Sequence, residues 1–399
     1  MKHTTVGVDI GSTALRAVEL AHSGQGRPVL RRVHEVALPA GAVSSGEVIE
    51  PNTVAAALKR LWAEGGFSTR SVVLGVGNQR VLARDLSVPK MSLKRIRSAL
   101  PLQVQDMLPV PVDEALLDFY PISETTTENG PMVNGLLIAA VKVAVLGNVR
   151  AAELAGLATR EVDLIAFALS RALVSGPGVT GPGITGSGVT DPEATGSIAV
   201  IDIGAKTTTV VIVQGGVPHF VRIIPTGGDD LTQALSSGLG ADAATAEHLK
   251  REVGLTAVRA LAGPGSWSAP PTETDAPGII ADVIGEQLVS LRNTINYFAN
   301  TRPKDPVRRI ILTGGASQLP GLSAALAGMT GIAVGSGDPF ACVVTPAGAA
   351  ELPGDGVPGT DPLRYAVALG LALGLGLTRG SERGSKRRTA RKLARGSVA

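Results

Sequence analysis

The sequence predicts an α/β protein with two lobes built on a duplicated unit, and an inserted α+β subdomain in the first lobe. Two stretches share one pattern: an apolar strand, Asp-Ile-Gly, a small polar turn and a second alternating strand. They are Val6–Leu20 (VGVDIGSTALRAVEL) and Ala199–Val213 (AVIDIGAKTTTVVIV). A β-hairpin that recurs once in each half of the 399 residues indicates a duplication. The 50 glycines and 26 prolines suit a chain with many turns.

The first lobe is expected over residues 1–174. After the first hairpin, the pattern predicts a helix at Asn52–Trp62, a strand at Ser71–Val76 and a last helix at Glu161–Val174. Residues 84–160 form a different unit, which predicts a compact inserted subdomain. Its expected elements are a strand at Arg84–Val88, a helix at Ser92–Met107, strands at Leu117–Ile122 and Asn134–Leu146, and a helix at Asn148–Ala158.

The second lobe is expected over residues 197–362. Its expected elements are helices at Asp229–Leu239, Ala241–Glu252 and Ile279–Phe298, and a strand at Arg309–Leu312. Apolar residues of the third helix recur at steps of three and four, which is typical of one buried helix face. Stretches rich in glycine and proline predict a linker at 175–196 and a loop insertion at 263–278. An apolar helix at 363–378 is expected to return to the first lobe and close the fold.

The positive charge is concentrated at the end of the chain. Residues 379–399 hold eight Lys or Arg and one acid, so this tail carries +7 and the rest about −4 of the net +3. This distribution argues against a nucleic-acid-binding body. It predicts a disordered basic tail with at most weak contact to a membrane surface. The single cysteine excludes a disulfide framework and a cysteine metal site, and the five histidines lack ligand spacing. With no secretory signal and no apolar stretch of about 20 residues, we expect a cytoplasmic protein.

The two hairpin turns offer the groups that bind a phosphate. Glycine lets the backbone approach closely, and the hydroxyls of Ser12 and Thr13 can donate to phosphate oxygens. Asp9, at the strand end, can hold Mg²⁺ through waters. The second hairpin repeats this set with Asp202, Gly204, Lys206 and Thr207. A single such turn is more often an ordinary turn, but its repetition favours a triphosphate gripped from both sides.

Three further features suit a nucleotide. The pair Gly314-Gly315 follows an apolar strand and would allow close approach of a nucleoside, although a plain strand-to-helix turn is the simpler interpretation. Gly227-Gly228 begins a helix, whose free N–H groups attract phosphate. Glu247 and Lys250 share a helix face and could reach the ribose and adenine, or could be a solvated ion pair.

Taken in order, DIGSTALRAVEL, IDIGAKTTTVVIV and IILTGGASQLPGL resemble the phosphate-1, phosphate-2 and adenosine motifs of the actin-like ATPase superfamily. Four further segments resemble the PilM family of type IV pilus assembly, a relative of the division protein FtsA: Leu86–Ser92, Val162–Leu169, Ile224–Thr232 and Ala246–Lys250. The resemblance covers about residues 6–378. It implies a two-lobed actin-like fold, that is, a duplicated ribonuclease H-like fold.

The resemblance also implies ATP and Mg²⁺ as ligands, with Asp9 and Asp202 at the metal. The implied nucleotide-binding residues are Asp9, Gly11, Ser12, Thr13, Arg16, Asp202, Gly204, Ala205, Lys206, Thr207, Gly227, Gly228, Glu247, Lys250, Gly314 and Gly315. No catalytic residue is assigned. Related proteins often carry a glutamate just before Ala166, and Ile165 stands there instead, which predicts weak or absent hydrolysis.

The function implied is that of a cytoplasmic scaffold peripheral to the inner membrane. It would recruit the N-terminal cytoplasmic peptide of a PilN-like inner-membrane protein in a groove beside the inserted subdomain. It would also link other pilus assembly proteins, including the motor ATPases, and self-association stays open. The alternatives are a small-molecule kinase of the sugar-kinase branch, an FtsA-like division protein and a chaperone. The kinase lacks a recognisable acidic base in the first lobe, and the chaperone lacks a substrate domain after the core.

Overall fold

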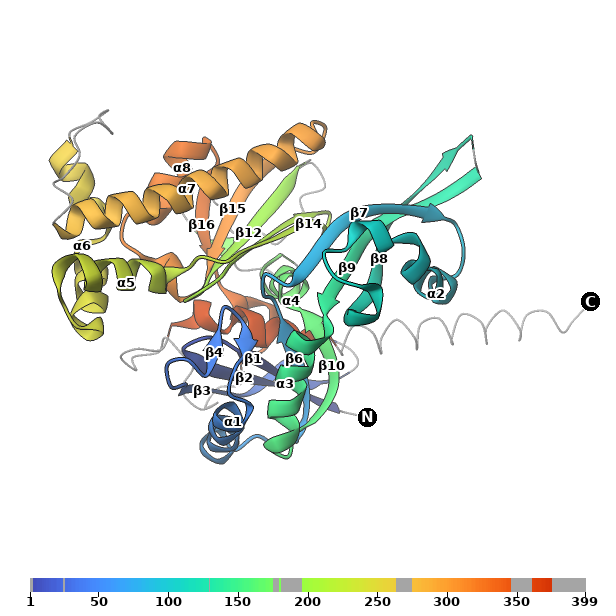
Figure 1. Ribbon diagram of the computed structural model, residues 1–399, viewed down its shortest axis with the longest axis horizontal. Coiled ribbons are helices and arrows are strands. Elements are labelled where there is room, and N and C mark those ends of the chain that lie inside the picture. Colours follow the sequence, from blue (N-terminus) through green and yellow to red (C-terminus); the bar gives the residue numbers. More distant parts are fainter. Residues whose placement is uncertain are drawn as a thin grey trace, which may run out of the picture.

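The computed structural model describes residues 3–23, 26–128, 130–174, 179–180, 196–262, 275–345 and 361–374. Most of the predicted linker at 175–196 and of the loop insertion at 263–278, and all of the basic tail at 379–399, lie outside these residues. The described part has two lobes, each built around a β-sheet, with a smaller sheet projecting from the first (Figure 1). The predicted two-lobed actin-like α/β class is confirmed.

The sheet of the first lobe has the strand order β10-β6-β1-β2-β3. Its strands are β1 (His3–Ile10), β2 (Ala14–His22), β3 (Val29–Ala37), β6 (Ser71–Val76) and β10 (Ala158–Leu164). Helices α1 (Pro51–Gly65) and α3 (Lys142–Leu154) contact each other and cover one face of the sheet (Figure 1). A short hairpin of β4 (Val43–Ser44) and β5 (Glu47–Val48) precedes α1.

The sheet of the second lobe has the order β11-β16-β15-β12-β13-β14. Its strands are β11 (Val179–Thr180), β12 (Ser197–Ile203), β13 (Thr208–Gln214), β14 (Val217–Ile224), β15 (Val307–Thr313) and β16 (Ala333–Gly337). Its helices are α5 (Gly228–Leu239), α6 (Ala243–Ala262), α7 (Ala276–Thr301) and α8 (Leu322–Thr330). Three short 3₁₀ helices also follow β15 along the chain: η3 (Gly315–Gln318), η4 (Pro339–Cys342) and η5 (Pro362–Tyr365).

The duplication seen in the sequence is repeated in the strand pairing. In the first lobe, β1 is antiparallel to β2 and parallel to β6. In the second lobe, β12 is antiparallel to β13 and parallel to β15. The register also matches, because Asp9 lies opposite Arg16 and Asp202 lies opposite Thr209, at the same distance along the chain. The two acids therefore occupy equivalent positions in the two lobes.

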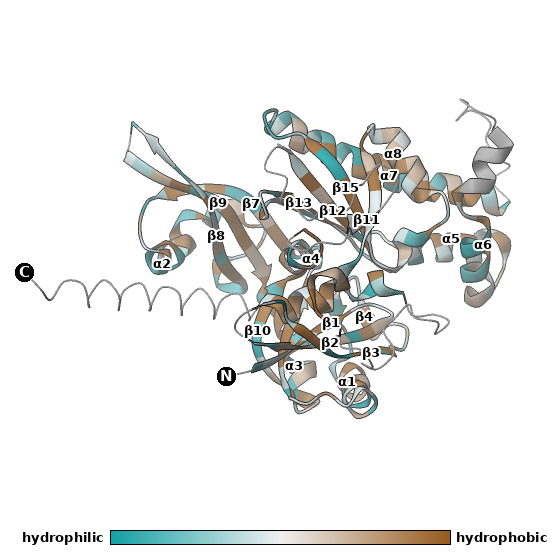
Figure 2. Ribbon diagram, turned by 180° about the vertical axis from the view of Figure 1, so that it is seen from behind, coloured by the Kyte–Doolittle hydropathy of each residue, from teal (hydrophilic) through white to brown (hydrophobic). Residues whose placement is uncertain are grey.

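The inserted subdomain is a three-stranded antiparallel sheet of order β7-β9-β8 with one helix. Its elements are β7 (Val81–Pro89), α2 (Leu93–Gln103), η1 (Gln105–Met107), η2 (Val112–Glu114), β8 (Ala115–Thr127) and β9 (Gly130–Val141). Phe119 and Leu137 are buried in a small core of its own. The end of the β8–β9 hairpin projects from the body (Figure 1), and few residues there have the colour of hydrophobic residues (Figure 2).

Three predicted element assignments are wrong. Residues 161–164 are not the start of a helix but the end of β10, because Val162 and Leu164 pair in parallel with Leu74 and Val76 of β6. Residues 142–146 are the first turn and a half of α3 and not the end of a strand. Residues 276–278 begin α7 instead of ending a loop. As a result, α3 and β10, within the predicted insertion at 84–160, lie with the sheet of the first lobe.

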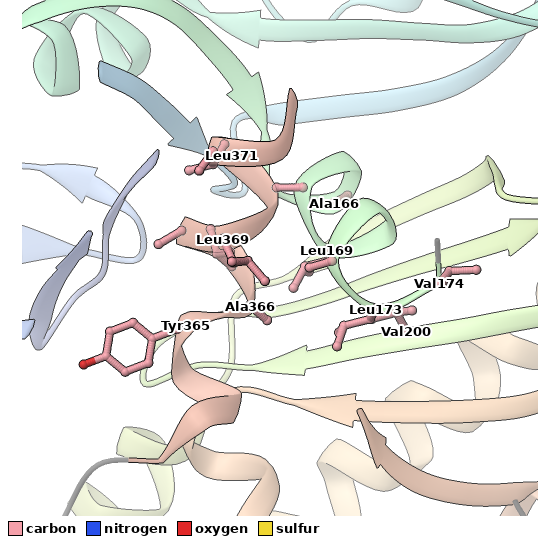
Figure 3. Close-up of a cluster of buried hydrophobic side chains, with 14 of the residues drawn as sticks. Ala166, Leu169, Leu173, Val174, Val200, Tyr365, Ala366, Leu369 and Leu371 are labelled. Carbon is pink, nitrogen blue, oxygen red and sulfur yellow. The ribbon is translucent and has the colours of Figure 1, made fainter. Parts of the chain in front are cut away.

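Two helices fill the space between the two sheets. They are α4 (Ile165–Leu173) and a helix at 366–374 that follows η5. Their buried side chains interdigitate with one face of each sheet (Figure 3), for example Leu169 and Leu371 with Val200 and Val18. The other face of the second sheet packs on α7 through Ile201. Each sheet thus has both faces covered, which fits the apolar strands of the sequence.

Further contacts join the lobes at the periphery. Val344, after η4, forms a parallel bridge with Val29 at the edge of the first sheet. On the opposite side, β14 contacts β7 of the inserted subdomain. There the guanidinium of Arg302 pairs with Asp85 at 2.8 Å and lies 2.9 Å from Nδ1 of His219. Among the described residues, no helix is long and apolar enough to cross a membrane.

Candidate nucleotide site between the two hairpins

One cavity of about 830 Å³ lies between the two duplicated hairpins. All of the predicted nucleotide-binding residues except Gly227 line it: Asp9, Gly11, Ser12, Thr13, Arg16, Asp202, Gly204, Ala205, Lys206, Thr207, Gly228, Glu247, Lys250, Gly314 and Gly315. Gly227 lies behind the wall, where a Cβ atom would come within 2.6 Å of the Ala205 backbone. Residues that are far apart in the sequence are therefore brought to one site.

The two hairpin turns are closed in the same way. The N–H of Gly11 donates to the carbonyl of Ala14 at 3.1 Å, and that of Gly204 donates to the carbonyl of Thr207 at 2.9 Å. A Cβ atom at Gly11 would lie 2.9 Å from the Ala14 oxygen, so a side chain there would disturb the turn. The closed turns hold Ser12 and its neighbours at the cavity wall, where hydroxyl and N–H donors suit an anion.

The acids at the two strand ends make the cavity electrostatically unusual. Burial, together with the like charge of Asp9, raises the pKa of Asp202 to about 7, although Arg16 acts in the opposite sense. Burial also raises the pKa of Asp9, against the favourable charge of Arg16, whose guanidinium is 3.7 Å away. A buried carboxylate, Asp9, and a half-buried one, Asp202, repel each other, and both would be stabilised by a divalent cation.

The two carboxylates suit a magnesium ion whose remaining ligands are waters and phosphate oxygens. No group of three or more His, Cys, Asp or Glu that could hold a metal occurs in the described part of the chain. Mg²⁺ usually keeps several waters and binds through one or two carboxylates plus phosphates. Asp9 and Asp202 fit this requirement, because each lobe supplies one carboxylate and the cavity leaves room for the other ligands.

Helices α5 and α6 build the wall of the second lobe. Lys206 pairs with Asp229 at 2.5 Å. Lys250 pairs with Glu247 and donates to Thr232 Oγ1 at 2.8 Å and to the carbonyl of Gly228 at 3.1 Å. Burial opposes ionisation of Glu247, but the hydrogen bonds from Lys250 and Thr232 outweigh it, and the pKa is lowered. The Lys250 side chain is only 12% exposed, so this pair is part of the cavity wall and not a solvated surface pair.

The glycine pair after β15 lies directly beside Asp202. Gly314 has φ of +86°, which favours glycine, and a Cβ atom there would lie 2.4 Å from the Asp202 carboxylate. A Cβ atom at Gly315, by contrast, would meet only the side chain of Arg364, at 3.6 Å or more. A side chain at position 314 would therefore clash with Asp202. A side chain at position 315 would meet no backbone and would extend into the cavity.

Beside Asp229 and Arg251, which line the cavity from α5 and α6, a group of three further charged residues at the site was not predicted. Arg364 and Asp361 line the cavity from η5 and its N-cap. Glu35, on β3, accepts from Arg16 Nε at 2.6 Å and from Arg364 Nη2 at 2.8 Å. Burial raises the pKa of Asp361 and lowers that of Arg364. No motif surrounds these residues, and only the return of the chain to the first lobe brings them to the hairpins.

Ile165, at the start of α4, lines the cavity as an apolar residue. The nearest acid in sequence, Asp163, is at the end of β10 and not in a helix as the sequence suggested. Its carboxylate pairs with Arg171 of α4. Asp163 is therefore engaged in a structural ion pair.

A second feature is a group of exposed apolar side chains at the junction of the inserted subdomain and the first lobe. Val143 and Leu146, one turn apart on α3, are 64% and 56% exposed. Ile49 follows β5, which contacts α3, and Leu116 lies on β8; they are 57% and 43% exposed. We call these four residues the α3–β8 patch. A small cavity of about 90 Å³ opens beside Leu116, between residues 108–110, the start of β7 and the end of β9.

The profile of the family described as type IV pilus assembly protein PilM matches residues 7–259, and that of cell division protein FtsA matches residues 199–352. FtsA of Bacillus subtilis (strain 168) is 21% identical over 241 residues, 54% of this chain and 51% of that protein. FtsA of Agrobacterium fabrum (strain C58 / ATCC 33970) is 30% identical over 142 residues, 33% of this chain and 32% of that protein. The chain thus spans about half or less of the length of these curated relatives.

Solved structures show similarity over more of the chain. A chain of a PilM-PilN type IV pilus biogenesis complex is 27% identical, with a TM-score of 0.75, and the match covers 94% of this chain and 98% of that one. The ethanolamine utilization protein EutJ of Carboxydothermus hydrogenoformans is 15% identical, with a TM-score of 0.51 and coverage of 93% and 89%. The second similarity shows the shared fold alone.

Proposed function

The chain belongs to the PilM family of type IV pilus assembly proteins, and on this basis we propose that it is a cytoplasmic, ATP-binding scaffold of pilus assembly. The observation that carries the proposal is the pair Asp9 and Asp202, one from each lobe, at the wall of a cavity between duplicated turns. A cavity of about 830 Å³ is within the range of small-molecule sites. Nucleotide and partner are argued separately below.

The proposed ligand is ATP with Mg²⁺. When bound, Mg²⁺ would offset phosphate charge, and Asp9 and Asp202 would hold it through waters. The turn residues Ser12, Thr13, Ala205, Lys206 and Thr207 would donate to the phosphates. The N–H groups of Gly227 and Gly228 donate to Asp230 and to the Gly204 carbonyl, so the start of α5 would position the second turn rather than donate to the ligand. Glu247 and Lys250 would bind the ribose and base edge, beside Gly314 and Gly315. Lys206 would exchange its partner Asp229 for a phosphate oxygen.

Nucleotide-dependent thermal stabilisation tests this proposal, because a ligand stabilises only the state that binds it. Mg·ATP should raise the melting temperature of the wild type, and Asp9→Asn should reduce the increase. Gly315→Arg should abolish it, because a side chain at Gly315 has room in the fold but fills the cavity. Asp282→Asn, at an exposed acid on α7, is the matched control and should behave as the wild type. Wild-type stabilisation in both site variants would refute the cavity assignment.

The proposed partner is the N-terminal cytoplasmic peptide of a PilN-like inner-membrane protein, which would place this protein at the inner face of that membrane. The similarity to a chain of a PilM-PilN complex supports the partner class. The α3–β8 patch supports the location, because four large apolar side chains are exposed beside the inserted subdomain. Burial of such side chains by an apolar peptide is favourable at roughly 25 cal/mol per Å².

The partner proposal is tested with the synthetic N-terminal peptide of the PilN-like protein from the same organism. The double variant Val143→Asp/Leu146→Asp should lose binding in a fluorescence titration, because it places two charges in the apolar patch. The matched control is Val289→Asp, at a valine of α7 that is 40% exposed on the second lobe. If the control loses binding and the patch variant keeps it, the peptide binds the second lobe and the location is wrong.

The scaffold would act by holding this membrane partner while other pilus assembly proteins, including the motor ATPases, contact the rest of its surface. Such a role needs a stable nucleotide-bound state more than rapid turnover. Ile165 supports this view, because it provides no group that could position a water beside the phosphates.

A further inference from the structure

Arg364 occupies a defined place in the cavity that the proposed nucleotide contacts leave unused. It lies on η5, immediately before the helix at 366–374 that fills the space between the lobes. Its side-chain stem runs beside Gly315: Nε, Cγ and Cδ would lie 3.6, 3.7 and 3.9 Å from a Cβ atom at that glycine. The carbonyl of Leu363, one residue earlier, accepts from Thr313 Oγ1 at 2.9 Å, which ties η5 to the end of β15.

The guanidinium of Arg364 is held from the first lobe. Nη2 donates to Glu35 at 2.8 Å, and the other oxygen of Glu35 accepts from Arg16 Nε at 2.6 Å. The Glu35 carboxylate thus accepts hydrogen bonds from two guanidinium groups. Nη1 of Arg16 in turn lies 3.7 Å from Oδ2 of Asp9. This chain of ion pairs holds the Arg364 head group, while its side chain is 28% exposed and lines the cavity, where a ligand can reach it.

We propose that Arg364 is a positioning residue for the base of the bound nucleotide, which stacks on its guanidinium beside Gly314-Gly315. The inference rests on the proposed function and adds a contact to it. A guanidinium is planar and weakly hydrated, and it stacks on aromatic faces. Gly315 has no side chain to separate the base from that plane. Because every base has a π-face, such a contact adds affinity and does not select one base.

Three probes distinguish stacking from a phosphate contact: Mg·ATP, Mg·GTP and inorganic tripolyphosphate with Mg²⁺, each measured by calorimetry. Arg364→Ala should weaken ATP and GTP binding about tenfold and change tripolyphosphate binding less than twofold. Arg364→Lys keeps the charge and the bond to Glu35 but lacks the plane, so it should weaken ATP nearly as much. Arg150→Ala is the matched control, because Arg150 lies on α3 outside the cavity and is 63% exposed; it should leave ATP binding within twofold.

The outcomes separate this inference from the function on which it rests. If the wild type binds neither ATP nor tripolyphosphate, the nucleotide proposal fails and this one with it. If the wild type binds ATP and Arg364→Lys binds it equally well, the stacking role alone is refuted. A loss of tripolyphosphate binding equal to the loss of ATP binding would also refute it, because Arg364 would then contact phosphate. The lysine variant decides the question should the alanine variant fail to fold.

Discussion

Asp202 shows how a single residue can be unfavourable for stability and suited to a ligand. It lies at the end of a central strand, opposite Thr209 and beside Gly314, where it is half-buried at the wall of the cavity. Burial and the charge of Asp9 disfavour its ionised form. An apolar residue at this position would avoid the free-energy cost of ionising a carboxylate beside Asp9. That an aspartate stands here despite this cost is consistent with a role in binding a cation.

We predict that Asp202 makes the metal-free protein less stable as the pH rises. Its folded-state pKa of about 7 exceeds the ordinary value of 3.8, so between these values the folded protein holds a proton that the unfolded chain has released. The free energy of unfolding therefore falls as the pH rises through this range. Asp202→Asn removes this dependence. Urea unfolding in EDTA should show the variant gaining stability relative to the wild type from pH 5 to pH 8.

Asp282→Asn controls for that experiment, because Asp282 is exposed on α7. Its stability difference from the wild type should be the same at both pH values. A constant difference for Asp202→Asn as well would contradict the raised pKa.

A second prediction at the residue scale concerns Ile165. Without an acid at this place, we expect ATP turnover well below ~1 per second, an ordinary enzyme rate. Ile165→Glu should raise the rate at least tenfold, since a positioned base typically contributes 10²–10⁴-fold. Ile165→Leu should leave it slow. The rate of phosphate release is measured for the wild type and for the two variants. A wild-type rate well above ~1 per second would contradict the prediction.

At the scale of elements, the junction of the two lobes depends on small residues. The helix at 366–374 packs directly on the backbone of β1 and of α4. A Cβ atom at Gly7 would lie 2.1 Å from the carbonyl of Ala368, and one at Gly370 would lie 2.0 Å from the carbonyl of Ala168. This close approach lets Leu369 and Leu371 fill the space between the sheets (Figure 3). Dense packing makes such a junction sensitive to one added methyl group.

Gly370→Ala should therefore destabilise the protein by about 1–3 kcal/mol or more, because the added methyl group overlaps the backbone of α4. The matched control is Gly285→Ala in α7. There no heavy atom lies within 4 Å of the added Cβ atom. This second change should be neutral or stabilising by up to about 1 kcal/mol, the difference in helix propensity. Chemical unfolding compares them, and equal effects would contradict the packing argument.

At the scale of the whole molecule, the proposed nucleotide site and the proposed partner site are separated in space. The cavity lies between the lobes, whereas the α3–β8 patch lies at the root of the inserted subdomain. Between them, β14 ends at Ile224, just before Gly227 and Gly228, and it contacts β7 of the inserted subdomain near the Asp85–Arg302 pair.

The charge of residues 379–399 leads to a prediction for the full chain. This tail lies outside the described residues, but its +7 charge is known from the sequence. At ~1 kcal/mol per basic residue near an anionic surface, it should hold the protein on anionic vesicles at low salt. High salt should release the protein, because it screens these charges.

Co-sedimentation with such vesicles is the measurement, and a chain truncated after Thr378 is the comparison. The truncated chain should stay in the supernatant. Binding that survives truncation, or that is absent even at low salt, would show that the tail makes no membrane contact.

The sequence by itself determined the fold class, the family and the residues of the cavity that belong to local motifs. The two hairpins could be predicted because each is a continuous pattern of strand, turn and strand, repeated in the chain. Gly314 could be predicted for the same reason, since it follows a strand directly. The PilM family assignment is confirmed by the profile match.

The tertiary structure decided what depends on contacts between distant segments. Glu35 and Arg364 are 329 positions apart and meet only because the chain returns to the first lobe after η4 and η5. The strand β10 escaped prediction because its seven residues become a strand through pairing with β6, a partner that local periodicity does not reveal. Local patterns report the backbone preferences of neighbouring residues. Ion pairs across lobes and the edges of a sheet are set by packing, which no single segment contains.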